Sequence, residues 1–152
     1  MCSLSQAAGF LVSQNARRCN SRLKDAIFYP DRPSGVLQIM NDIELLNNLY
    51  DRFNARDISA ILVHLHHDVA WANGMEGGHV YGHEGVREYW TRQWKLIDPH
   101  VEPRGVSTLA DGTVVVEVRQ LVRDLKGVLL SNTMVHHLFL IENDLIKRFD
   151  IQ

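Results

Sequence analysis

The last third of the chain places acidic and basic residues two positions apart on segments that resemble β-strands. Arg148 precedes Asp150 by two residues, and Glu117 precedes Arg119 by two. Residues two apart on a strand point to the same face, so each carboxylate is expected beside a cation. Such a carboxylate can act as an acid–base group in catalysis, or its arginine can neutralise it in a structural ion pair. The residues alone leave both interpretations of Asp150 open.

Aromatic residues and histidines form a second group with possible chemistry. Trp71, Tyr89 and Trp90 could line a pocket for a flat ligand, or they could be ordinary core residues. A metal site would need three or four ligands to converge, and Gly82 disfavours the helix that would align two of the histidines. We therefore expect no metal site among the histidines of the middle segment, which are His64, His66, His67, His79 and His83.

Three helices followed by an antiparallel sheet are predicted to position these residues. Apolar residues recur at helical spacing over residues 41–53, 58–65 and 86–97, and Asn41 with Glu44 resembles a capping box at the start of the first helix. Residues 69–73 predict a short strand. Asp111-Gly112 favours a hairpin turn. Further strands are expected over residues 114–123, 129–141 and 145–152, which gives an α+β class with helices on one face of the sheet.

Composition divides the 152 residues into two unlike segments. Residues 1–39 hold five basic and two acidic residues and both cysteines, whereas residues 40–152 hold 11 basic and 16 acidic residues and all eight histidines. We predict a poorly ordered N-terminal extension over 1–39, either transit-like or preceding the natural start, and one folded domain over 40–152. A net charge of −2 and the lack of a long apolar run predict neither nucleic-acid nor membrane binding, and a cytoplasmic location is expected, with an organelle as the alternative.

Three strings in residues 41–152 resemble the nuclear transport factor 2-like superfamily, in its SnoaL-like (polyketide cyclase) and ketosteroid isomerase-like branch. They are residues 49–57 (LYDRFNARD), 67–71 (HDVAW) and 82–90 (GHEGVREYW). The resemblance implies a cone in which a curved antiparallel or mixed sheet wraps around the three N-terminal helices and encloses a pocket. It also implies dimerisation through the outer face of the sheet.

The same resemblance suggests roles for individual residues. In SnoaL-like cyclases a histidine on the penultimate strand pairs with an aspartate on the last strand, and His136 and Asp150 resemble that pair. The pairing requires a three-residue loop in the last hairpin, because a two-residue loop places His137 opposite Asp150 instead. His136 and Asp150 are therefore the predicted catalytic residues. The predicted substrate contacts are Arg119, Arg148, Trp71, Asn73, Tyr89, Trp90, Glu117 and Met134.

Two functions are consistent with this pattern. The first is an enzyme of isomerase, cyclase or hydrolase type that works without a cofactor on a hydrophobic substrate bearing a carbonyl or epoxide, with Asp150 as the acid–base group. The second is a non-catalytic ligand-binding or dimerisation module with the same pocket. The expected partners are a small hydrophobic molecule and a second copy of the chain.

Overall fold

The computed structural model describes residues 34–152, so residues 1–33 of the predicted extension over residues 1–39 lie outside the described residues. The first described helix, α2, spans Ser34–Asn54. It begins seven residues earlier than predicted, because Ile39 continues the apolar stripe and packs against the core. Asn41 and Glu44 therefore lie inside the helix rather than at its cap, and the predicted domain boundary at residue 40 falls within α2. No helix in residues 34–152 is long and apolar enough to cross a membrane.

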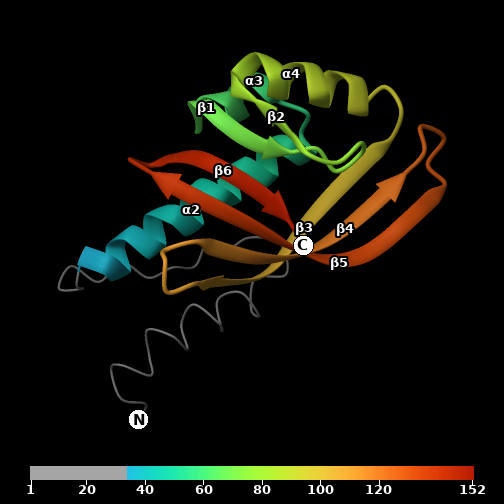
Figure 1. Ribbon diagram of the computed structural model, residues 1–152. Coiled ribbons are helices and arrows are strands. Elements are labelled where there is room, and N and C mark those ends of the chain that lie inside the picture. Colours follow the sequence, from blue (N-terminus) through green and yellow to red (C-terminus); the bar gives the residue numbers. More distant parts are fainter. Residues whose placement is uncertain (1–33) are drawn as a thin grey trace, which may run out of the picture.

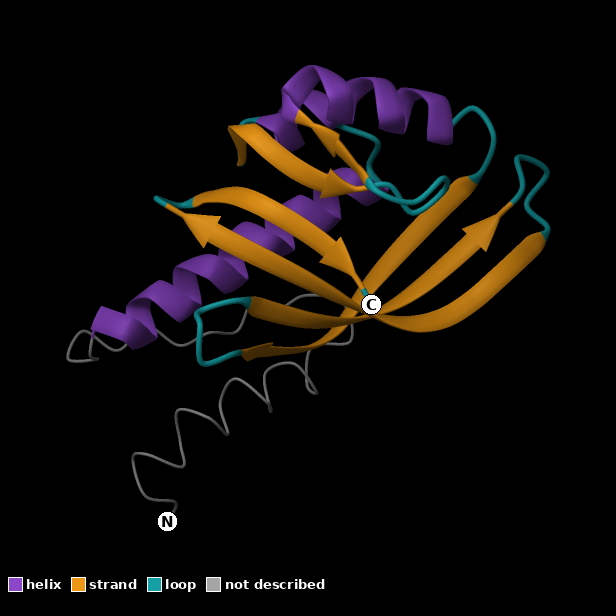
Figure 2. Cartoon of the chain, viewed as in Figure 1, coloured by secondary structure: helices purple, strands orange, loops and turns teal. Residues whose placement is uncertain are grey.

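A six-stranded mixed sheet follows, in the order β2-β1-β6-β5-β4-β3. Only the β1–β6 pair is parallel. The helices α2, α3 and α4 pack on the concave side of this curved sheet (Figures 1 and 2), which confirms the predicted α+β cone. The remaining elements are α3 (Ile58–Leu62), β1 (Leu65–Ala72), β2 (His79–Tyr81), α4 (Gly82–Gln93), β3 (Asp98–Thr108), β4 (Val114–Arg123), β5 (Leu129–Glu142) and β6 (Leu145–Ile151).

Gly82 connects β2 directly to α4 and fixes where that helix starts. Its φ of +70° is in the left-handed region, and a Cβ there would lie 3.2 Å from the carbonyl oxygen of His67. Only glycine fits this turn without strain. The turn lays α4 across β1, so that Tyr89 and Trp90 are buried against Trp71 and the rest of the core.

The last hairpin has a register that differs from both predicted registers. Asn143 and Asp144 form a two-residue turn with positive φ at both positions, as type I′ turns require. The pairing then shifts by one residue at an irregularity next to Leu140, and Leu138 becomes the partner of Asp150. An extra residue in one strand of a pair, a β-bulge, produces such a shift.

This register determines which side chains face the helices. Val116, Val118, Phe139 and Phe149 are buried on the concave face of the sheet. Their sequence neighbours point the other way because strand side chains alternate. The predicted orientation of β4 and β6 is wrong, because the valines of β4 are the side chains that the core buries and the shifted register turns the end of β6. The convex face carries the polar set that was expected in the pocket, namely Glu117, Arg119, Arg148 and Asp150.

Candidate functional site

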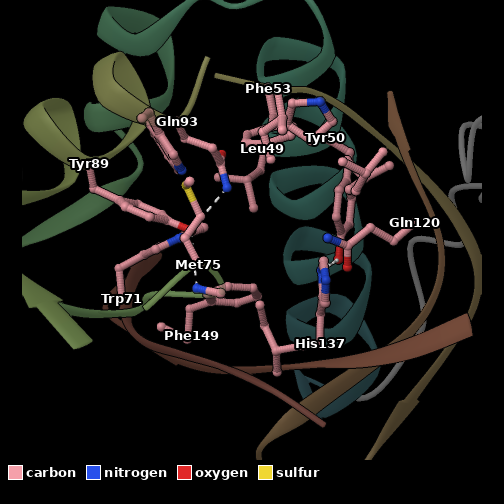
Figure 3. Close-up of a pocket in the computed structure, with 18 of the residues that line it drawn as sticks. Leu49, Tyr50, Phe53, Trp71, Met75, Tyr89, Gln93, Gln120, His137 and Phe149 are labelled. Carbon is pink, nitrogen blue, oxygen red and sulfur yellow. Dashed lines mark hydrogen bonds between the residues drawn. The ribbon is translucent and has the colours of Figure 1, made fainter. Parts of the chain in front are cut away.

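A cavity of about 160 Å³ lies between α2, α4 and the concave face of the sheet. An apolar cavity of about 150 Å³ can hold a benzene ring, so this space suits a molecule of one ring with small substituents. No Asp, Glu, Lys or Arg is among the described residues that line it. Its walls are mainly the rings of Tyr50, Phe53, Trp71, Tyr89, Trp90, His137, Phe139 and Phe149 (Figure 3).

Tyr50 of α2 and His137 of β5 form a buried hydrogen-bonded pair at one side of this cavity. The Tyr50 hydroxyl lies 3.0 Å from Nδ1 of His137. Burial lowers the pKa of His137 to about 3 and raises the pKa of Tyr50 well above its usual value. Both groups are therefore neutral near pH 7. The Tyr50 hydroxyl has no other acceptor among the described residues, so we assign its hydrogen to Nδ1 and the imidazole hydrogen to Nε2 of His137.

Gln120 adds an amide to the same side of the cavity. It is a polar exception on the concave face of β4, where Val114, Val116 and Val118 are buried. Its side-chain amide lines the cavity and forms no hydrogen bond with any described residue. Figure 3 shows Gln120, Tyr50 and His137 on one side of the hollow, so this side offers two hydrogen-bond donors to a ligand.

Tyr89 and Gln93 of α4 occupy the other side of the hollow (Figure 3). Gln93 donates through Nε2 to the Tyr89 hydroxyl at 3.0 Å, and the backbone N–H of Gly74 donates to the same oxygen at 3.1 Å. Burial raises the pKa of Tyr89 above its usual value. The remaining Gln93 atom, Oε1, is buried without a hydrogen-bond partner.

Asn73 was predicted to contact substrate, but its side chain shapes a turn instead. Its Oδ1 accepts from the backbone N–H groups of Met75 and Glu76 at 3.1 and 3.0 Å. Its Nδ2 donates to Glu76, whose carboxylate also forms an ion pair with Arg92. Asn73 does not line the cavity, and its contribution is to hold Met75, which does.

Asp150 and His136, the predicted catalytic pair, do not line the cavity. Asp150 accepts hydrogen bonds from Arg148 Nε at 2.6 Å and from His79 Nε2 at 2.7 Å on the convex face. Burial alone would raise the pKa of Asp150, but the hydrogen bonds from Arg148 and His79 outweigh it and lower that pKa. His136 is exposed and pairs with Gln152 through the backbone. The predicted position of this pair in the pocket is wrong, because the bulge turns Asp150 to the convex face and His136 alternates with the buried His137 on β5.

The other polar residues predicted in the pocket lie on the convex face as well. Arg119 donates to Asn132 at 3.0 Å and lies 3.7 Å from the carboxylate of Glu102. Glu117 is exposed, and Met134 is 52% exposed. Arg148 is bound to Asp150 as described above. None of these four side chains lines the cavity.

Trp71, Tyr89 and Trp90 line the cavity as predicted. Trp71 stacks on Phe149 with ring centroids 4.1 Å apart, and Trp90 meets Trp71 edge to face at 5.1 Å. Three polar groups of the cavity were not predicted from the sequence, namely Tyr50, Gln93 and Gln120, and His137 was only the alternative to His136. The alternation along β4 could have predicted which face of this strand is buried, because burying Glu117 and Arg119 would cost more free energy than burying Val116 and Val118.

The histidines at the start of β1 form a small exposed cluster with an acid. Ligand atoms of His66, His67 and Asp68 lie within 4.8 Å of one another. However, the ammonium of Lys147 lies 3.2 Å from Nδ1 of His66. A fixed positive charge at this distance opposes binding of a metal cation.

A curved sheet that encloses a cavity together with α2 and α4 is the architecture of the nuclear transport factor 2-like superfamily. Within it, residues 46–149 match the model of the SnoaL-like domain, and the chain belongs to this family. No curated protein matches the chain.

Solved structures support the same assignment. TerC, co-crystallised with polyporic acid, is 27% identical over 74% of this chain and 90% of its own, with a TM-score of 0.65. A candidate polyketide cyclase from Sinorhizobium meliloti is 20% identical over 72% of this chain and 94% of its own, with a TM-score of 0.62. A ketosteroid isomerase-like protein from Catenulispora acidiphila, in complex with trimethylamine, is 13% identical over 72% of this chain and 84% of its own, with a TM-score of 0.61.

Proposed function

We propose that this protein binds a small, uncharged ring compound in its concave cavity and holds a carbonyl oxygen of that compound against His137 and Gln120. The observation that carries this proposal is the neutral Tyr50–His137 pair in an otherwise apolar cavity. The hydrogen on Nε2 and the free Gln120 amide are two donors for one oxygen. An uncharged ligand is favoured because a charge would be desolvated there without a counter-ion.

The two donors also suggest a reaction of isomerase or cyclase type. A neutral imidazole that donates to a carbonyl polarises it, which makes a hydrogen on the adjacent carbon more acidic. The likeness to TerC, crystallised with polyporic acid, and to a candidate polyketide cyclase supports a role of this type. Asp150 has no part in it, because its carboxylate is held on the opposite face. A second candidate is ligand binding without turnover, which the absence of a carboxylate from the described lining favours.

Binding of acetophenone and of benzoate tests the proposal. Acetophenone is expected to quench the fluorescence of Trp71 and Trp90 saturably, with an affinity at least about tenfold higher than that of benzoate, which carries a charge into the cavity. Equal affinity for both compounds, or no binding of either, would contradict the proposal. Exchange of the acetophenone methyl hydrogens in D₂O, followed by NMR, then separates the candidates. Accelerated exchange supports the reaction, and binding without exchange supports the second candidate.

We also propose that two copies pair through the convex face of the sheet. Met134 is 52% exposed on the convex side of β5, and Leu130, at a register shift nearer the start of this strand, is 58% exposed. Apolar side chains at this exposure favour a covering partner. Sedimentation velocity at micromolar concentration is expected to show a species of twice the 17.4 kDa chain mass. The Met134→Asp variant is expected to shift it to the monomer, and a wild-type protein that sediments only as a monomer would contradict the pairing.

A further inference from the structure

Tyr89 and Gln93 lie one turn apart on the buried face of α4, so they face the cavity together. Gln93 is 8% exposed, although a glutamine side chain is usually solvated. A buried amide is tolerated when all of its hydrogen-bonding groups are paired. Here one end of the Gln93 amide bonds to Tyr89 and the other end has no partner.

A count of hydrogens shows what this pair lacks. The Tyr89 oxygen accepts from Gly74 and Gln93, which leaves the Tyr89 hydroxyl hydrogen without an acceptor among the described residues. If the Gln93 amide is turned over, its oxygen accepts the Tyr89 hydroxyl and its NH₂ group becomes unpaired. In both orientations, therefore, at least one polar hydrogen at this side of the cavity lacks an acceptor.

The two polar sides of the cavity are separated by an aromatic floor. His137 lies on β5 and Trp71 on β1, with β6 and its Phe149 ring between them. Two strand spacings place β5 about 10 Å from β1, the strand whose Trp71 lies below α4. A single ring that carries substituents on opposite carbons spans such a distance. In Figure 3, Tyr89 and Gln93 lie across the hollow from Tyr50 and His137.

We propose that the ligand carries acceptor oxygens at both ends of one ring, and that Gln93 with Tyr89 selects the second oxygen. The inference rests on the proposed function, in which His137 and Gln120 hold the first oxygen. It assigns Gln93 a role in specificity: a compound that presents a methylene group to this side leaves the polar hydrogen unpaired. Such a compound is bound less tightly than its oxygen-bearing isostere.

Two ketones of nearly equal shape test this directly. 4-Methoxyacetophenone and 4-ethylacetophenone differ by an ether oxygen in place of a methylene group at the end opposite the carbonyl. The wild-type protein is expected to bind the methoxy compound about five- to tenfold more tightly, as measured by calorimetry. The double variant Tyr89→Phe/Gln93→Met removes both polar groups at this side and is expected to bind the two compounds equally. A matched Gln120→Met variant is expected to weaken both and keep the preference.

The outcomes separate this inference from the proposal on which it rests. Equal affinity of the wild-type protein for the two ketones overturns the selecting role of Gln93 and leaves the proposed function standing. A preference that survives in Tyr89→Phe/Gln93→Met overturns it as well. If the wild-type protein binds neither ketone, the proposed function itself fails. Circular dichroism of each variant confirms that a lost preference does not reflect a lost fold.

Discussion

Replacing His137 with leucine is expected to weaken binding of 4-methoxyacetophenone by at least about tenfold, because the ligand oxygen loses a buried donor. The same change is expected to lower the free energy of unfolding by about 1–3 kcal/mol, since the Tyr50 hydroxyl is then buried without a partner. Calorimetric titration and urea unfolding measure the two effects separately.

The double variant Tyr50→Phe/His137→Leu distinguishes function from stability. It removes both partners of the hydrogen bond, so much of the lost stability is expected to return while binding stays weak. Asp150→Asn is the matched control on the convex face and is expected to bind like the wild type. If the double variant binds as tightly as the wild type, His137 does not contact the ligand.

Acid is expected to destabilise the protein through the same histidine. Burial lowers the pKa of His137 from 6.5 to about 3 in the folded state. Between these two pH values the imidazole is protonated in the unfolded state and neutral in the folded state. The stabilisation is complete above pH 6.5 and is lost as the pH falls, by about 1.4 kcal/mol per unit, or about 3 kcal/mol between pH 6.5 and 4.

Urea unfolding at several pH values measures this slope. The double variant Tyr50→Phe/His137→Leu lacks the imidazole. The slope of its free energy of unfolding against pH is therefore expected to be smaller by the contribution of nearly one proton over the same range. His64, whose pKa burial and Arg52 also lower, remains in both proteins and contributes equally to both. Parallel pH profiles for the two proteins would show that His137 is not buried in a neutral form.

The order of elements in the last third was predictable from the sequence. Asp111-Gly112 marks a turn, and residues 114–123 form β4 with the predicted bounds. The first helix was placed too late, because Asn41 and Glu44 have the residue types of a cap whereas Ile39 extends the apolar stripe that the core buries. Packing of that stripe outweighed the capping signal.

The faces of the last strands were not predictable in the same way. A single bulge in β6, where Lys147 is the extra residue opposite Leu140 and Ile141, moves Asp150 opposite Leu138, and a one-residue slip reverses every side chain that follows. Bulges have no firm sequence signature. Trp71, Tyr89 and Trp90 were expected beside a pocket and line the cavity, because their size and apolar surface favour burial in this fold. His136 and His137 are adjacent histidines, so side-chain type could not distinguish the buried one from the exposed one.

The most direct test of the account is an NMR titration of the protein with 4-methoxyacetophenone, which locates the ligand on one face of the sheet. We expect the largest shifts at the indole N–H of Trp71, at the ring of His137 and at the backbone amides around Phe149. Resonances of His79 and Arg148 on the convex face are expected to stay near their starting positions. Shifts confined to His79, Arg148 and Asp150 would contradict a site in the concave cavity.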